Sequence, residues 1–349
     1  MTKIQSFLKN YDIMLFDMDG VITSEQTYWT VAALTAFEFL QSDEYCGSVP
    51  FDRRAAYNRR SEIRDSVFSL DKTIGILKDK GVNSNWDLAY VVICLSLIQD
   101  TDDFDQIYAS CRDLTGPILD EYDRLALLTA NRIGRPISYC RRNGPFWKQI
   151  VALFQRWYLG CADIPGLIRQ EQPLFPISVT RTILSALHEN GKILGYGTGR
   201  PSVEILGPLT DWGLIDLFDK SRRITYDNIL EDEALLRQNG KVTALTKPHP
   251  YMFLKGSFKS DYPVDRLLNH DFDDSILKRV LVVGDAGADI LAAQAMGADF
   301  CAVLTGVTGQ KARPYFVAQK ATYILNSICD FLPDLQVIPT RAARDDKTE

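Results

Sequence analysis

The chain has 349 residues, of which 46% are hydrophobic and 24% are charged, a composition typical of globular proteins. This length exceeds the usual size of one hydrophobic core, so we expect two domains. The formal net charge of −6 argues against general nucleic-acid binding, which requires a basic surface.

The seven cysteines have no CxxC spacing, and the three histidines have no metal-ligand spacing. This pattern favours reduced thiols over disulfides or a zinc site. The beginning of the chain has no apolar segment typical of a signal peptide. The longest apolar stretch, residues 88–98, is shorter than the roughly 20 residues that span a membrane. We therefore expect a cytoplasmic protein that binds neither membranes nor nucleic acid.

The first predicted element is a buried strand over residues 13–16, followed directly by Asp17-Met18-Asp19-Gly20. An uninterrupted run of large apolar residues is typical of a strand that is covered on both faces in a parallel sheet. If the chain stays extended, Asp17 and Asp19 lie on the same side. Ligands of open α/β sheets bind beyond the carboxyl ends of strands, where these residues would lie. The alternative interpretation is a solvated turn, because Asp and Gly are common turn residues.

Residues 23–174 are predicted to be mainly helical, with helices over 30–40, 86–99, 104–115 and 146–159. Strands and helices then alternate, with strands predicted over 192–197, 224–229, 280–283 and 300–304 and a helix over 290–296. The predicted fold is therefore α/β: a Rossmann-like parallel sheet core with an inserted, mainly α-helical cap domain. We place the core at residues 1–22 and 175–335, the insertion at 23–174, and a polar C-terminal tail at 336–349.

Further polar residues lie where the Asp17 edge predicts them. Thr198 and Asp285 follow predicted strands, so they belong to the same carboxyl edge, and Asp289 lies one helical turn after Asp285. Lys247 precedes a proline, which favours an extended conformation at the lysine. Taken alone, Lys247 would be interpreted as an ordinary surface lysine. The glycines at 195, 197 and 199 do not match the GxGxxG spacing of a dinucleotide-binding loop and do not open the fold.

In this order, the motifs resemble those of the haloacid dehalogenase-like (HAD) superfamily, and in particular its phosphotransferases with an aspartate nucleophile. The resemblance covers about half of the chain. It is carried by Asp17-Met18-Asp19-Gly20-Val21, Thr198-Gly199-Arg200, Lys247-Pro248 and Gly284-Asp285-x-x-x-Asp289.

The resemblance implies a Mg²⁺-dependent phosphatase that hydrolyses a small phosphorylated metabolite through an aspartyl-phosphate. Asp17 would be the nucleophile and Asp19 the general acid and base. The phosphoryl group would be bound by Thr198, Gly199 and Lys247. The magnesium ligands would be Asp17, the Asp19 carbonyl, Asp285 and Asp289, the last either directly or through water.

Two alternatives stay open. A phosphomutase of the beta-phosphoglucomutase type would use the same residues, and a non-catalytic binding protein could share the fold. In the family the inserted domain closes over the site and selects the substrate, but here it is longer than the compact four-helix version. The arginines of residues 131–145 are candidates for binding a second anionic group of the substrate: Arg132, Arg135, Arg141 and Arg142.

Overall fold

In the computed structural model, the chain forms two compact units, and residues 2–82, 84–115 and 118–335 are described. The first unit comprises Met1–Ser24 and Gln172–Glu349, and the second comprises Glu25–Glu171. The two boundaries between the units therefore lie two and three residues from the boundaries expected from the sequence. The predicted polar tail, residues 336–349, lies outside the described residues.

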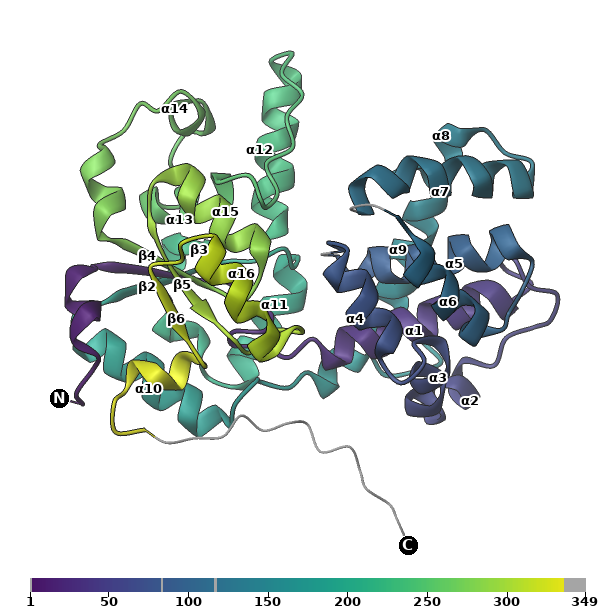
Figure 1. Ribbon diagram of the computed structural model, residues 1–349, viewed down its shortest axis with the longest axis horizontal. Helices are drawn as coiled ribbons and strands as arrows, with labels where there is room; N and C mark the ends of the chain where they lie inside the picture. The colour runs from purple at the N-terminus through teal and green to yellow at the C-terminus, as the bar shows by residue number, and fades with distance from the viewer. Residues whose placement is uncertain (1, 83, 116–117, 336–349) are drawn as a thin grey trace, which may run out of the picture. The chain divides into compact units, whose positions relative to one another are not determined.

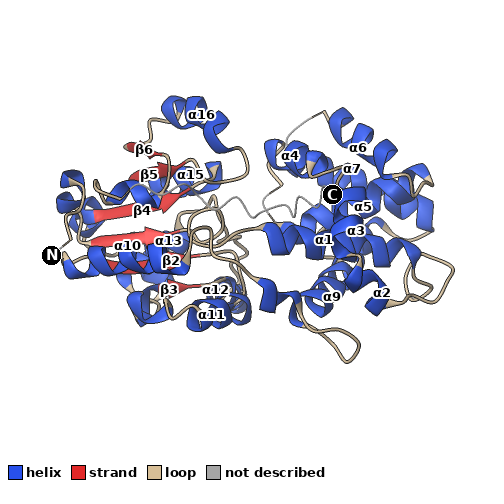
Figure 2. Ribbon diagram, turned by 90° about the horizontal axis from the view of Figure 1, so that it is seen from below, coloured by secondary structure: helices blue, strands red, loops and turns tan. Residues whose placement is uncertain are grey.

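The first unit is built on a six-stranded parallel sheet with the order β3-β2-β1-β4-β5-β6 (Figures 1 and 2). Its strands are β1 (Ile13–Phe16), β2 (Ile193–Gly197), β3 (Arg223–Ile224), β4 (Val280–Gly284), β5 (Asp299–Val303) and β6 (Tyr323–Leu325). Its helices are α10 (Ile177–Glu189), α11 (Ser202–Asp211), α12 (Tyr226–Gln238), α13 (Tyr251–Phe258), α14 (Val264–Leu268), α15 (Gly287–Met296) and α16 (Arg313–Ala318).

Strand β1 lies in the middle of the sheet and is buried on both faces. Met14 and Phe16 belong to one apolar cluster, with side chains from α10 and α11, whereas Ile13 and Leu15 belong to the opposite cluster, with side chains from α12, α13 and α15. Successive residues of a strand face opposite sides, and here both sides are covered by helices. This explains why the strand is apolar without alternation.

The strand register determines which residues leave the sheet together. Phe16 pairs with Tyr196 of β2 and with Val283 of β4. The parallel strands therefore end at the same level, and the residues that follow β1, β2 and β4 emerge side by side at one edge.

Two elements of the first unit differ from the expectation. Strand β3 ends at Ile224, and helix α12 occupies most of the range predicted as a strand. The backbone N–H of Thr225 donates to Asn228 Oδ1 over 3.0 Å, an interaction that stabilises a helix start. The buried Ile229 therefore belongs to the first turns of a helix. The short edge strand β6 was not predicted.

The second unit contains helices and no strand among its described residues. They are α1 (Gln26–Gln41), α2 (Arg53–Asn58), α3 (Arg60–Val67), α4 (Lys72–Asp79), α5 (Asn85–Gln99), α6 (Phe104–Asp113), α7 (Ile118–Ile133), α8 (Ile137–Cys140) and α9 (Pro145–Leu159). Helix α1 packs against α3, α5 and α9. The apolar run in α5 is almost wholly buried, as expected for a central helix.

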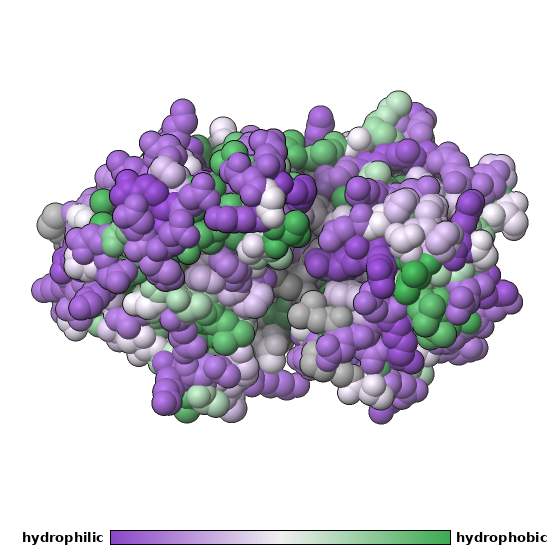
Figure 3. Space-filling view, turned by 90° about the horizontal axis from the view of Figure 1, so that it is seen from above, coloured by the Kyte–Doolittle hydropathy of each residue, from purple (hydrophilic) through white to green (hydrophobic). Residues whose placement is uncertain are grey.

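Short 3₁₀ helices complete the chain at Ser6–Asn10, Leu167–Gln170, Ile215–Leu217, Lys220–Arg222, Asp274–Arg279, Gly309–Ala312 and Ile328–Phe331. None of the described helices combines the length and the apolar character needed to cross a membrane. Hydrophilic side chains cover most of the face shown in Figure 3. All seven cysteines are unpaired.

Candidate active site

The centre of the candidate site is a buried lysine between two carboxylates. Lys247 lies in the loop between α12 and α13, and its Nζ donates to Asp17 Oδ1 and to Asp289 Oδ1, each over 2.8 Å. It also donates to the Gly197 carbonyl at the end of β2, over 3.2 Å. Residues from four distant segments therefore meet at one ammonium group. The surface-lysine interpretation of Lys247 does not hold.

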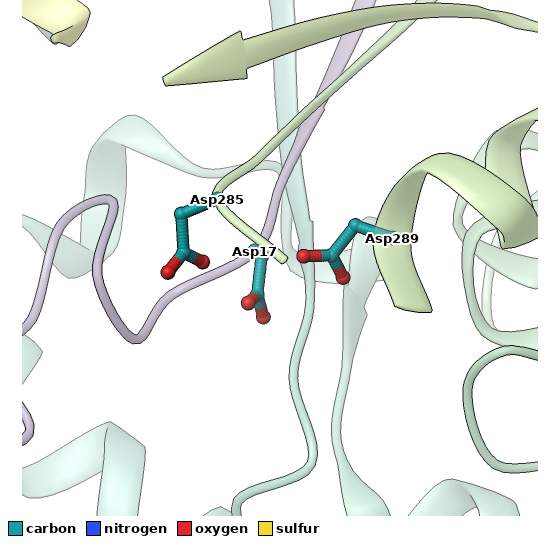
Figure 4. Close-up of side chains that lie close together, drawn as sticks. All are labelled: Asp17, Asp285 and Asp289. Carbon is teal, nitrogen blue, oxygen red and sulfur yellow. The ribbon is translucent and has the colours of Figure 1, made fainter. Parts of the chain in front are cut away.

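Asp285 completes a cluster of three carboxylates at the carboxyl edge of the sheet (Figure 4). One carboxylate oxygen from each of Asp17, Asp285 and Asp289 lies within 4.8 Å of the other two. The Asp289 side chain is held by its own helix, because Oδ2 accepts from the Ala286 backbone N–H at the start of α15. A carboxylate is a favourable group at this position, because helix N-termini carry partial positive charge.

Glycines make room for Asp285. Gly20 adopts φ = +74°, and a Cβ there would lie 2.4 Å from Asp285 Oδ2. A Cβ at Gly306 would lie 1.9 Å from the same oxygen. The close approach of two backbone segments thus fixes the Asp285 carboxylate beside Asp17.

The charges of the cluster do not balance. If all three carboxylates are ionised, they carry three negative charges against the single positive charge of Lys247. Burial, reinforced by the neighbouring Asp289, raises the pKa of Asp17 to about 7, and Lys247 only partly opposes this. Burial by itself lowers the pKa of Lys247, but Asp17 and Asp289 more than offset it, so this pKa lies above its ordinary value.

This arrangement fits a divalent cation. The ligands offered are carboxylate oxygens, which suit hard ions such as Mg²⁺, and the excess negative charge is of the sign that a cation relieves. Each carboxylate oxygen has two lone pairs, so the bonds to Lys247 leave positions for a metal ion. Asp17, Asp285 and Asp289 each offer a carboxylate oxygen to such an ion, and Asp17 and Asp289 also contact Lys247.

Thr198 and Gly199 lie in the turn after β2, next to the Gly197 carbonyl that Lys247 contacts. Thr198 is fully buried, and its Oγ1 accepts from the Arg200 backbone N–H over 3.2 Å. The residue that sequence reasoning missed is Arg200, which was noted only as the last residue of this motif. Its guanidinium pairs with Asp19 through Nε, at 3.1 Å from Oδ1 and 3.0 Å from Oδ2.

Three of the four arginines expected to select substrate form ion pairs within the second unit. Arg132 pairs with Asp100, Arg141 with Asp123, and Arg142 with the buried Asp87. Arg135 has no ion pair among the described residues, and its guanidinium lies over the Tyr139 ring, 5.4 Å from the centroid. The ion-pair partners lie in other segments of the chain, so the spacing of the arginines does not reveal them.

Replacing Gly20 by alanine should weaken cation binding. The added Cβ would displace the Asp285 carboxylate, and the positive φ adds strain of about 1–2 kcal/mol. The matched control is Gly297→Ala, because Gly297 has φ = +79° but a Cβ there meets no atom within 4 Å. We expect both variants to lose stability in thermal unfolding, but only Gly20→Ala to lose most of the stabilisation by Mg²⁺. Equal Mg²⁺ responses in the two variants would contradict the assignment of Asp285.

Cation affinity should also depend on pH. Below a pKa of about 7, Asp17 is protonated in the cation-free protein and must lose that proton when a cation binds. We expect Mg²⁺ affinity to fall about tenfold per pH unit below this value and to level off above it. Calorimetric titration at about pH 6 and pH 8, in buffers with different ionisation enthalpies, measures affinity and released protons together. Equal affinity at both values, with no proton release at the lower one, would show that Asp17 does not titrate in this way.

Comparison with known proteins supports one family. The family described as HAD-hydrolase-like matches residues 244–331, a range that includes Lys247, Asp285 and Asp289. No curated protein matches the chain.

A solved structure has a similar fold over most of the chain. An X-ray structure from the Northeast Structural Genomics Consortium is 27% identical, with a TM-score of 0.70 over 91% of this chain and 96% of the other. A putative phosphatase from Clostridium difficile (17% identity, TM-score 0.41, 91% and 95% covered) and a putative haloacid dehalogenase-like hydrolase from Bacteroides fragilis (16%, 0.46, 91% and 97%) are more distant. The family match over residues 244–331, the parallel sheet and the acidic cluster at its carboxyl edge together support membership of the haloacid dehalogenase-like superfamily.

Proposed function

We propose that the protein is a Mg²⁺-dependent phosphatase that hydrolyses a small phosphorylated metabolite through an aspartyl-phosphate on Asp17. The observation that carries this proposal is the buried contact of 2.8 Å between Lys247 Nζ and Asp17 Oδ1 at the carboxyl edge of the sheet. A phosphate ester repels an anionic nucleophile, so attack by a carboxylate requires positive charge at the reacting atoms. Lys247 supplies such a charge beside the attacking oxygen.

In the first step, a carboxylate oxygen of Asp17 attacks phosphorus and the bond to the ester oxygen breaks. Asp19 gives its proton to that oxygen, and the alcohol leaves. Lys247 and Thr198 bind the phosphoryl oxygens, on which negative charge collects in the transition state. The contacts of Lys247 Nζ with Asp17 Oδ1 and with the Gly197 carbonyl support this role for Lys247.

In the second step, the Asp19 carboxylate removes a proton from water, and the water oxygen attacks phosphorus. The bond between phosphorus and Asp17 breaks, which releases inorganic phosphate and restores both aspartates to their starting protonation states. Asp17 and Asp285, with the Asp19 carbonyl and Asp289, would hold the metal ion. When bound, Mg²⁺ would neutralise negative charge on the nucleophile and the phosphoryl oxygens.

The acidic net charge and the absence of a basic motif for nucleic acid support a small-molecule substrate. The cytoplasm is the proposed setting, because its thiols stay reduced and the seven cysteines are unpaired. Product analysis separates the alternatives. Free phosphate supports the phosphatase, an isomeric sugar phosphate supports a phosphomutase, and no turnover with Mg²⁺ supports a binding protein.

Replacing Asp17 by asparagine should remove the nucleophile with little change in shape. We expect turnover of p-nitrophenyl phosphate to fall by about 10⁴-fold or more. We also expect the covalent phosphoenzyme formed by the wild type to be absent after acid quenching and peptide mass spectrometry. The control is Asp12→Asn, which changes an exposed aspartate paired with Arg279 just before β1. Persistent turnover in Asp17→Asn, or a phosphoryl group on another residue, would contradict the assignment.

Arg135 is the arginine that we propose for a second anionic group of the substrate, because it alone of the four lacks a carboxylate partner among the described residues. Arg135→Ala should raise KM for the physiological phosphate ester about tenfold or more, since a charge-assisted bond contributes about 1.5–3 kcal/mol. KM for p-nitrophenyl phosphate should stay nearly unchanged. Arg132→Ala, which removes an exposed ion pair with Asp100, is the matched control. The same change in KM for both substrates would exclude this role.

A further inference from the structure

The side chain of Asp19 is held by donors that are not spread evenly over its two oxygens. Oδ1 accepts from the Arg200 Nε and Nη2 groups and from Thr23 Oγ1, the last over 2.9 Å. Oδ2 accepts only a bond of 3.0 Å from Arg200 Nε among the interactions described. The single N–H of Arg200 Nε is shared by both oxygens, so Oδ1 has two further donors, whereas Oδ2 keeps a lone pair that none of the described interactions uses.

Arg200 is fixed more firmly than its partner. Its side chain is 2% exposed, whereas that of Asp19 is 24% exposed. Its backbone is held on both sides, because its N–H donates to Thr198 Oγ1 and its carbonyl accepts from the Tyr226 N–H at the start of α12. The arginine therefore forms a rigid support beneath the carboxylate, and the open side of Asp19 is left for a ligand.

We propose that Arg200 is a positioning residue for Asp19: together with Thr23 it holds Oδ1 and leaves Oδ2 to exchange the proton during the reaction. This rests on the proposed function. In the first step the proton on Oδ2 passes to the ester oxygen as the bond from phosphorus to that oxygen breaks. In the second step Oδ2 takes a proton from the attacking water. The planar guanidinium suits this task because it fixes the orientation of the carboxylate plane, which a single ammonium cannot do.

A purely structural ion pair is the competing explanation, and leaving groups of different basicity distinguish the two. The value of kcat/KM reports the steps up to release of the alcohol. An alkyl alcohol needs the proton from Asp19 to leave, whereas p-nitrophenolate is stable without one. If only Asp19 is misplaced, hydrolysis of the alkyl ester should therefore slow more than hydrolysis of the aryl ester. If the whole site is distorted, hydrolysis of both esters should slow.

The test is kcat/KM of Arg200→Gln for p-nitrophenyl phosphate and for an alkyl phosphate that the wild type hydrolyses. For the alkyl ester we expect a loss of about 10²-fold or more, within the range of general acid catalysis, and for the aryl ester a loss below about tenfold. A burst of p-nitrophenol should appear, because the same carboxylate acts as the base in the slowed second step. Arg200→Lys should recover part of the loss. Equal losses for both esters, or no loss, would overturn the proposal.

Two further variants keep the result interpretable. Thr23→Val removes only the hydroxyl that donates to Asp19 Oδ1. It should lower kcat/KM for the alkyl ester selectively, but less than Arg200→Gln does. This variant therefore tests the proposal even if Arg200→Gln does not fold. Arg181→Gln changes an arginine of α10 that donates to the carbonyls of Trp212 and Gly213, and it should alter neither ester. A selective loss in Arg181→Gln, or its absence in Thr23→Val, would count against the proposal.

A structural readout separates this proposal from the proposed function. If the wild type hydrolyses no phosphate ester with Mg²⁺, the proposed function fails, and crystal structures of the wild type and Arg200→Gln still decide the positioning role. We expect Asp19 Oδ1 to face Arg200 in the wild type and the Asp19 side chain to occupy other rotamers in the variant. An Asp19 side chain with the same orientation in both structures would show that Arg200 does not fix it.

Discussion

The structure of the candidate site depends on one buried ammonium group. Lys247 Nζ is the only donor that joins Asp17 to Asp289 among the described residues, and both contacts measure 2.8 Å. A buried charge is stable only when it is paired, and here one positive charge is shared among more carboxylates than it can neutralise. Burial, followed by the negative charge of the neighbouring Asp289, raises the pKa of Asp17. The site is therefore preorganised to attract a cation and to hold charge at the point where Asp17 would react.

The fold produces this concentration of charge through its strand order and through glycines near Asp285. Because β1 is central and parallel to both neighbours, three chain segments end at one edge without any long loop. Glycine at positions 20 and 306 allows two backbone segments to approach Asp285 closely. The Ala286 backbone N–H at the start of α15 donates to Asp289 Oδ2 and holds this side chain in place. The acidic cluster is thus a consequence of strand order and of a few positions where no side chain fits.

Much of the fold and of the candidate site could be predicted from the sequence, because the residue patterns that indicate them lie within short segments. The apolar run at residues 13–16 and the aspartates after strand ends identified the sheet and its functional edge. Non-local pairings were missed: the bidentate contact of Arg200 with Asp19 joins residues 181 positions apart. The partners of the arginines in residues 131–145 were missed for the same reason. The prediction of a strand over 224–229 was wrong for most of its length, because the contact of the Thr225 N–H with Asn228 Oδ1 starts helix α12 there.

We propose that Asp17, Lys247 and Asp285 act together on one phosphoryl group and one divalent cation. The most direct measurement is a crystal structure with Mg²⁺ and beryllofluoride, which mimics the phosphoryl group of an acyl phosphate. We expect beryllium bonded to an Asp17 carboxylate oxygen, Lys247 Nζ within hydrogen-bonding distance of a fluoride, and Mg²⁺ bound by Asp17 and Asp285. Beryllofluoride on another residue, or Mg²⁺ bound away from these aspartates, would contradict it.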